Sequence, residues 1–234
     1  MTNDTKHYAG DASHTGSYYA ASANTKTLRP ALTGDYEVDI CVVGAGFTGL
    51  STALHLTEKG YKVAVIEGAR VGWGASGRNG GQIVNGLNAS LEKIKRSYGE
   101  DAANFVGTLL QEGAQTIFEK IEKYSIDCDL KQLNIFTAYT SKQMKELEAK
   151  QVLWRKHGMD DHELLDKNQL KKHIGSDVYA GGMVDHSGAH IHPLNLALGE
   201  AAAIEQNGGV IFEKTMLMSM ERQADNSQLL ITDN

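Results

Sequence analysis

Two short apolar runs flank an amphipathic segment near the start of the chain. "YEVDICVVG" (residues 36–44) and "YKVAVIE" (61–67) are rich in β-branched residues, as expected for strands that are buried on both faces. Between them, "FTGLSTALHLTEKG" repeats leucine and alanine at helical spacing and closes at Gly60. A strand, a helix and a strand within about thirty residues predict a βαβ unit and therefore an α/β fold.

Helical and extended patterns alternate in the middle of the chain. Apolar residues recur at helical spacing within residues 101–124, and "NIFTAYT" (134–140) has the β-branched and aromatic content of a strand. The charged segment 141–158 predicts an exposed helix with Ser141 as its N-cap. A short helix is expected after Asp166. This region therefore predicts a mixed α and β part after the βαβ unit.

The last quarter of the chain is more apolar. "VYAGGMV" (178–184) predicts a strand, and "DHSGAHIH" (185–192) predicts a loop. The segment 193–209 predicts a helix, with Pro193 in its first turn and Gly208 at its end. Three short apolar runs then predict strands, at 210–212, 216–220 and 228–232. The turn-like sequence "QADNS" joins the last two.

A glycine motif sits between the first strand and the first helix. "VVGAGFTGL" contains G-x-G-x-x-G at Gly44, Gly46 and Gly49, and the strand–helix context is what gives this motif its meaning. Gly44 permits the tight turn, Gly46 lets a pyrophosphate approach the backbone, and Gly49 allows close helix–strand packing. The helix that begins near Phe47 offers free N–H groups to phosphates. The motif predicts a dinucleotide site.

An acidic residue closes the second strand. Glu67 lies 18 residues after Gly49, where a carboxylate binds the hydroxyls of a ribose. The same carboxylate would repel a 2′-phosphate, which argues against NADP. A glycine-rich turn in some other α/β protein is the alternative, but the motif, its context and the acid together favour a dinucleotide.

A second glycine-rich segment, "GASGRNGGQI" (74–83), follows the second strand. A nicotinamide enzyme needs only the first motif and the acid, whereas FAD is longer and needs more donors beyond them. The segment supplies unshielded backbone amides and side-chain donors at Gly74, Ser76, Gly77, Arg78, Asn79, Gly80, Gly81 and Gln82. A flexible surface loop is the alternative, although loops beside such sites commonly carry function. The pair of glycine segments favours FAD.

Composition and charge exclude several classes of function. The net charge is −6 without a basic block, so nucleic acid is not an expected partner. No signal peptide and no run of about 18 apolar residues are recognisable. Cys41 and Cys128 lack CxxC spacing, which indicates a reducing compartment, and a cytoplasmic location is expected. His186, His190 and His192 cluster, but no acidic or cysteine partner completes a metal-ligand spacing, so no metal is expected.

The segment from Cys41 to Ile83 resembles the FAD-binding opening of the D-amino-acid oxidase superfamily of flavin amine oxidases. More specific segments are similar to the gamma-glutamylputrescine oxidases within it: "SYYAASAN", "SGRNGGQ", "IDCDL" and "DHSGAHIHPLNLALGEA". The resemblance runs from about Tyr18 to the end of the chain. It implies a Rossmann-like FAD-binding domain with part of a second, mixed α+β substrate domain.

The resemblance also implies a reaction. Enzymes of this kind oxidise the amine-bearing carbon of gamma-glutamylputrescine to an imine, and hydrolysis gives gamma-glutamyl-aminobutyraldehyde and ammonia. Molecular oxygen takes the electrons and becomes hydrogen peroxide. The cofactor carries the redox chemistry, while the protein binds and orients it. Two alternatives stay open: another superfamily oxidase or dehydrogenase for secondary amines or D-amino acids, and an inactive nucleotide-binding fragment.

Site residues are carried over by position. Those implied to bind FAD are Gly44, Ala45, Gly46, Phe47, Thr48, Gly49, Glu67, Arg70, Ala75, Ser76, Arg78, Asn79, Gly80, Gly81, Gln82 and Leu217. Arg78 is expected near the flavin ring, with a phosphate role as the alternative. Leu217 stands where the superfamily offers a backbone contact to adenine. No catalytic residue is assigned.

The resemblance further implies a division of the chain. An N-terminal arm is expected at 1–34, a first FAD-domain segment at 35–125, a substrate-domain segment at 126–185, and a return to the FAD domain at 186–234. Chains of this family are longer. The sequence is therefore expected to be an N-terminal portion, with the C-terminal parts of both domains outside it.

Overall fold

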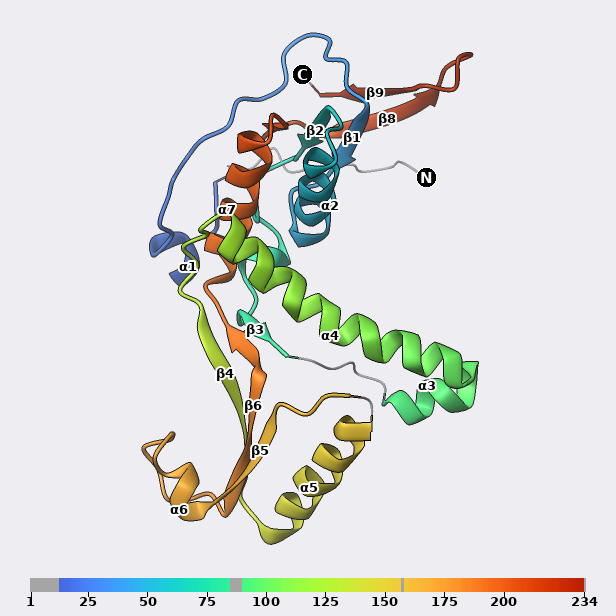
Figure 1. Cartoon of the computed structure of the whole chain (residues 1–234). Helices are drawn as coiled ribbons and strands as arrows, with labels where there is room; N and C mark the ends of the chain where they lie inside the picture. The colour runs from blue at the N-terminus through green and yellow to red at the C-terminus, as the bar shows by residue number, and fades with distance from the viewer. Residues whose placement is uncertain (1–12, 85–89, 157, 234) are drawn as a thin grey trace, which may run out of the picture. The chain divides into compact units, whose positions relative to one another are not determined.

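The computed structural model describes residues 13–84, 90–156 and 158–233 (Figure 1). It divides into two compact units. The first comprises Met1–Gly80, Ile121–Cys128 and His192–Asn234, and the second comprises Gly81–Lys120 and Asp129–Ile191. This grouping places Gly81–Lys120 with Asp129–Ile191, whereas the sequence analysis expected one FAD-domain segment over 35–125 and a substrate-domain segment over 126–185; that assignment of domains stays a prediction.

The first unit is built on a parallel sheet of three strands in the order β1-β2-β7. The strands are β1 (Ile40–Val43), β2 (Val63–Ile66) and β7 (Val210–Phe212). Helix α2 (Phe47–Glu58) connects β1 to β2 and packs beside α7 (Pro193–Gln206). The predicted βαβ unit and the α/β class are confirmed.

Two glycines of this unit, Gly49 and Gly208, have structural roles in or just after a helix. Leu50 and Leu54 of α2 are fully buried with Val65 of β2. A Cβ at Gly49 would collide with the carbonyl oxygen of Gly44, so glycine permits α2 to lie close to the end of β1. Gly208 has a φ of 85° just beyond α7, as a helix-terminating glycine should.

Strand β1 lies at the border of the sheet. In the described part of the chain it pairs with β2 alone, from Ile40 opposite Val63 to Val43 opposite Ile66. Val43 is 54% exposed. One side of β1 is thus open to another strand.

The N-terminal arm is fixed to the first unit from residue 13 onward, whereas residues 1–12 lie outside the described part. It contains the short helix α1 (Tyr18–Ala21), capped by Ser17. Tyr19 packs on the core and meets the ring of His192 at 5.0 Å between centroids. Tyr18 is 76% exposed, so Tyr19 is the tyrosine of α1 that packs against the core.

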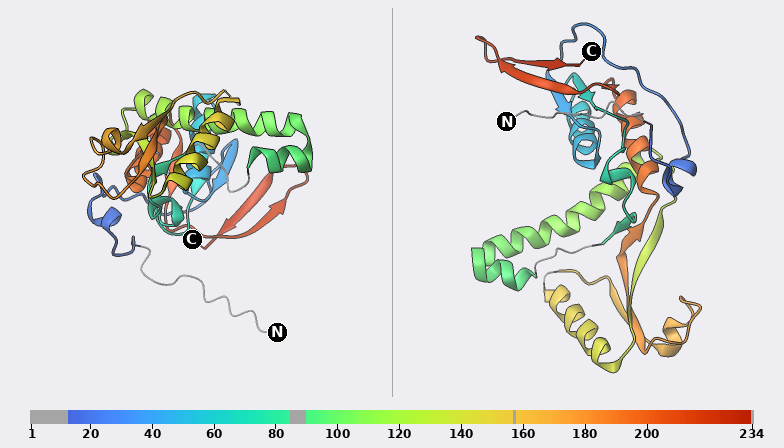
Figure 2. Two further views of the ribbon diagram at one scale, coloured as in Figure 1. Left: turned by 90° about the horizontal axis from the view of Figure 1, so that it is seen from below. Right: turned by 180° about the vertical axis from the view of Figure 1, so that it is seen from behind.

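Two further strands close the described chain. β8 (Leu217–Arg222) and β9 (Gln228–Thr232) pair antiparallel through the predicted turn, in which Asn226 has a φ of 71°. This hairpin extends away from the parallel sheet of the first unit (Figures 1 and 2).

The second unit contains an antiparallel sheet centred on β6 (Gly181–His190). β4 (Lys131–Ala138) lies along one edge of β6, while β3 (Gln82–Ile83) and β5 (His162–Asp166) pair with opposite ends of its other edge. Its helices are α3 (Leu91–Tyr98), α4 (Glu100–Lys123, which ends in the first unit), α5 (Ser141–Lys156) and α6 (Lys167–Leu170).

The loop expected at 185–192 is wrong, because β6 continues through it to His190. Asp185 pairs with His162 on one side and Asn134 on the other, and these ladder partners outweigh the turn-like composition. Gly188 serves packing, since a Cβ there would collide with the side chain of Asn134.

The N-cap expected at Ser141 is also misplaced by one residue. Ser141 is the first residue of α5, and the Oγ1 atom of Thr140 accepts the backbone N–H of Gln143 at 3.2 Å. The Gln143 side chain in turn accepts the N–H of Thr140, which completes a reciprocal capping arrangement.

Candidate cofactor site

The first glycine loop leaves β1 in a conformation that favours glycine. Gly44 has a φ of 96°, and its N–H donates to the carbonyl oxygen of Ile66 at 2.7 Å. No heavy atom lies within 4 Å of the position of a Cβ on Gly44. Gly46 then caps α2 without a side chain to accept its first N–H groups. The loop therefore offers open backbone and a helix start that suits phosphate oxygens.

Glu67 closes β2 directly beside this loop. Its carboxylate accepts the backbone N–H groups of Ala45 and Ala69, each at 2.8 Å. A carboxylate has about four acceptor positions, so these two bonds orient the group and leave capacity for hydroxyl donors. The acid therefore lies against the backbone of the glycine motif.

Ser76 joins the two glycine segments. Its Oγ accepts the backbone N–H of Phe47, the first residue of α2, at 3.0 Å. A Cβ on Gly46 would lie 3.0 Å from the same oxygen. The second segment thus supplies the cap that Gly46 cannot, and it places a hydroxyl at the helix start.

Part of the glycine content of the second segment serves packing. A Cβ on Gly77 would collide with the carbonyl oxygen of Gly72, and it would lie 3.0 Å from Leu194 of α7. Gly72 has a φ of 67° and approaches Leu194 and Ala197 equally closely. Gly74 differs, because no heavy atom lies within 4 Å of its Cβ position. Between Gly74 and Gly77, Gly74 is therefore the glycine whose missing side chain leaves open space among the described residues.

Arg78 and Asn79 of the segment are exposed. Arg78 donates from Nε to the carbonyl oxygen of Gly74 at 3.1 Å and stacks on Trp73, with Cζ 5.1 Å from the ring centroid. The amide of Asn79 donates to the carbonyl oxygens of Ala75 and Ser76. These contacts fold the segment onto itself as the turn η1 (Ala75–Gly77).

The end of the segment passes into the second unit. Gly80 is the last residue of the first unit, and Gly81, with a φ of 68°, begins the second. Gln82 is exposed and opens β3. The structure thus brings Gly44 to Gly49, Glu67 and Ser76 together within one unit, while Gly81 and Gln82 belong to the other.

Arg70 makes a contact that the sequence did not predict. Its Nη1 lies 2.8 Å from Oε2 of Glu213, which is 1% exposed. The other oxygen of Glu213 accepts the N–H of Val71 at 2.9 Å, and Oε2 also receives the N–H of Arg29 at 3.3 Å. Glu213 follows β7 as Glu67 follows β2, so an acid just after a buried strand was the available signal.

The three clustered histidines take separate roles. His192 caps α7, with Nδ1 accepting the N–H of Asn195 at 3.1 Å, so its proton lies on Nε2, 3.1 Å from the Ser22 hydroxyl. His186 is exposed beside Glu163 at 3.5 Å, and His190 is exposed. Across the described residues, no group of three His, Cys, Asp or Glu side chains is placed to hold a metal.

Burial raises the pKa of the Cys41 thiol in β1, which keeps it protonated and unreactive. None of the helices in the described ranges has the length and apolar character to cross a membrane. Leu217 opens β8 opposite Thr232 and is partly exposed.

Comparison with known proteins defines the class. Residues 39–233 match the family described as FAD dependent oxidoreductase, and the chain belongs to this family. FAD is the cofactor of the family, and a solved relative, L-alpha-glycerophosphate oxidase from Mycoplasma pneumoniae, has FAD bound.

Among curated proteins, the chain is 47% identical over 208 residues to gamma-glutamylputrescine oxidoreductase of Escherichia coli, covering 89% of this chain and 49% of the relative. It is 44% identical to the probable oxidoreductase OrdL of Haemophilus influenzae, covering 88% and 48%. The chain thus spans about half the length of these relatives.

Solved structures show the same fold at lower identity. L-amino acid deaminase from Proteus myxofaciens has a TM-score of 0.71 at 16% identity, covering 90% of this chain and 46% of that one. Glycine oxidase from Geobacillus kaustophilus has a TM-score of 0.63 at 21% identity, covering 84% and 51%.

Proposed function

We propose that this protein takes part in the FAD-dependent oxidation of gamma-glutamylputrescine. The products would be gamma-glutamyl-aminobutyraldehyde, ammonia and hydrogen peroxide, with molecular oxygen as the acceptor. The observation that carries the FAD part is the convergence of Ser76 and Glu67 on the loop from Gly44 to Gly46. The substrate rests on the 47% identity to the E. coli gamma-glutamylputrescine oxidoreductase.

The first loop is proposed to hold the pyrophosphate. The described residues leave open space at the Cβ position of Gly44, and the N–H groups of Phe47, Thr48 and Gly49 form the first turn of α2. Such a turn has N–H groups without intrahelical partners and a favourable dipole for anions. The Ser76 hydroxyl, already on the N–H of Phe47, can reorient toward a phosphate oxygen.

Glu67 is proposed to hold the adenosine ribose through its remaining acceptor positions. Leu217 is proposed to contact adenine through its backbone. The residues of the second segment proposed to follow the cofactor beyond its phosphates are Ala75, Ser76, Arg78, Asn79, Gly80, Gly81 and Gln82. FAD, when bound, supplies the ring that accepts two electrons from the amine-bearing carbon.

Arg70 has a different proposed role from direct cofactor binding. Its guanidinium is paired with Glu213, and Glu213 also accepts the N–H of Val71, three residues before the second segment. Arg70 and Glu213 would therefore orient this segment, and they would affect cofactor binding indirectly, through Val71 and the residues that follow.

The test uses the protein purified from its native cells, at whatever length its gene encodes. The flavin is released and identified, and peroxide is measured with gamma-glutamylputrescine, sarcosine and D-alanine. Preference for gamma-glutamylputrescine supports the proposal. Preference for sarcosine or D-alanine assigns the protein to secondary amines or D-amino acids, and bound FAD without peroxide favours a nucleotide-binding role.

A further inference from the structure

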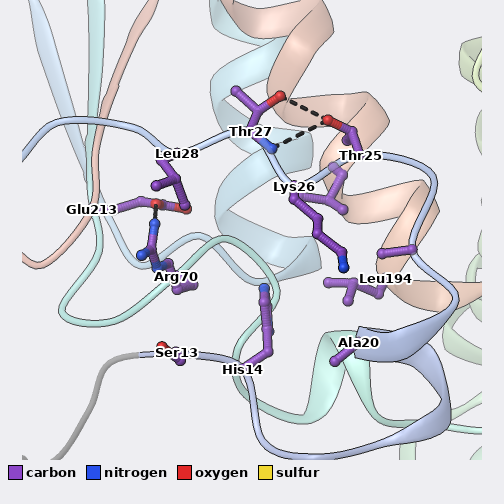
Figure 3. Close-up of a pocket in the computed structure, with 12 residues that line it drawn as sticks. Ser13, His14, Ala20, Thr25, Lys26, Thr27, Leu28, Arg70, Leu194 and Glu213 are labelled. Carbon is purple, nitrogen blue, oxygen red and sulfur yellow. Dashed lines mark hydrogen bonds and ion pairs between the residues drawn. The ribbon is translucent and has the colours of Figure 1, made fainter.

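A cavity of about 340 Å³ lies in the first unit beneath the N-terminal arm (Figure 3). The arm contributes most of its lining, and the rest comes from α7, from the loop after β2 and from the end of β7. Its volume lies at the small end of the range of about 300–1,000 Å³ found for small-molecule sites.

One wall of the cavity is apolar. Leu194 and Leu198 of α7 face it and are themselves buried in the core. Ala20 and Ala23 of the arm add small apolar surfaces. Because these side chains belong to a packed helix and to an arm held by backbone and side-chain hydrogen bonds, the wall is preformed.

The lining also contains four titratable side chains, those of His14, Lys26, Arg70 and Glu213. Arg70 and Glu213 neutralise each other at 2.8 Å, and Glu213 has both oxygens occupied. Burial lowers the pKa of His14, helped by Arg70 and Arg78 against the opposing effect of Glu213, so its imidazole is neutral at pH 7. Lys26 forms no ion pair with any described residue. Among the described residues, the lining thus keeps one uncompensated positive charge, on the exposed Lys26.

We propose that this cavity binds a small organic carboxylate, with its anionic group on Lys26 and its apolar chain against Leu194 and Leu198. Ammonium–carboxylate hydrogen bonds are stronger than neutral ones, and the leucines favour a short hydrocarbon chain over a bare inorganic anion. Of the residues that line the cavity, Arg70 is the one that the sequence analysis expected to bind FAD, and its proposed role is to orient the second glycine segment through Glu213. The site is therefore an addition to the proposed function and does not depend on it.

The test titrates the protein, purified at the length that its gene encodes, with pentanoate and with pentanamide, its uncharged isostere, by isothermal calorimetry or ligand-observed NMR. Saturable pentanoate binding is expected, with pentanamide about tenfold weaker, as for loss of one charged contact worth about 1.4 kcal/mol. No saturable binding of pentanoate, or equal binding of pentanamide, overturns the proposal.

Variants locate the binding. Lys26→Met keeps an unbranched apolar stem, removes the ammonium group and should weaken pentanoate binding about tenfold. Lys59→Met, at an exposed lysine at the end of α2, should leave pentanoate binding unchanged. Ala20→Leu should fill the cavity and abolish binding with the circular dichroism spectrum retained. Unchanged binding in both Lys26→Met and Ala20→Leu, or displacement of pentanoate by FAD, places the ligand elsewhere and overturns the site.

Discussion

Arg70 and Glu213 form a buried ion pair of 2.8 Å across 143 residues of sequence. The same carboxylate holds the N–H groups of Val71 and Arg29, so one side chain at the end of β7 fixes both the second glycine segment and the N-terminal arm. A charge of this kind is costly to bury alone, and its three partners compensate for that cost.

Glu213→Gln should lower the free energy of unfolding by about 3 kcal/mol, because it leaves Arg70 without its buried counter-ion and turns a donor toward the N–H groups. Chemical denaturation measures the change. Lys95→Gln is the matched control: its partner Glu100 is exposed, so the loss should be at most about 1 kcal/mol. Equal losses in the two variants would show that burial of the Glu213 pair does not matter.

Substitutions at Gly74 and Gly77 should distinguish a glycine that leaves room for the cofactor from a glycine that is needed for packing. Gly74→Val enters open space and should weaken FAD binding while leaving the melting temperature nearly unchanged. Gly77→Ala, in contrast, should lower the melting temperature, because its Cβ collides with Gly72 and crowds Leu194. Flavin fluorescence and thermal melts measure both. Normal FAD affinity in a stable Gly74→Val variant would remove this loop from the cofactor path.

Arg78→Ala tests a residue whose structural role is small. Arg78 is exposed, and its contacts are a stacked Trp73 and one carbonyl oxygen, so folding stability should change by less than about 1 kcal/mol. FAD affinity should fall several-fold if the guanidinium reaches a phosphate or the ring. Arg78→Lys keeps the charge but loses the planar donor fork. Full FAD affinity in both variants would make Arg78 a surface charge.

The pH dependence of stability should carry a contribution from His14. Its folded-state pKa lies below the ordinary value of 6.5 because of burial, so the unfolded chain binds the proton more readily. The contribution is therefore present above pH 6.5 and is lost as the pH falls toward the folded pKa. His14→Gln should flatten the stability profile in that window. An NMR titration of His14 with a midpoint at or above 6.5 would contradict this prediction.

The sequence predicted the parts of the site that depend on local contacts. Gly44, Gly49 and Glu67 lie within one βαβ unit, where strand, turn and helix determine one another over a few residues. Residues 185–190 form part of strand β6 because they pair with residues near 134 and 162. A pattern of neighbouring residues in the sequence cannot reveal such distant partners. The Arg70–Glu213 pair was missed for the same reason, since only the fold brings the ends of β2 and β7 together.

The open side of β1 leads to the last prediction. β1 pairs with β2 alone in the described part of the chain, and Val43 is 54% exposed, so this strand offers unpaired backbone groups and apolar surface to other chains. The chain also spans about half the length of its curated relatives. We therefore expect the 234-residue chain by itself to self-associate, to bind FAD weakly through its first glycine loop, and to release no peroxide with gamma-glutamylputrescine.

Light scattering, flavin absorbance and peroxide release test these three expectations. Val43→Lys places a charge on the open strand and should reduce self-association, whereas Val178→Lys, at a comparably exposed valine of the second unit, should not. Because Val43 precedes Gly44, FAD binding is measured in both variants to separate the edge from the site. A chain that is monomeric, carries one FAD per molecule and releases peroxide would contradict the prediction. It would show that β1 needs no further neighbouring strand and that these residues hold the flavin without the rest of the protein.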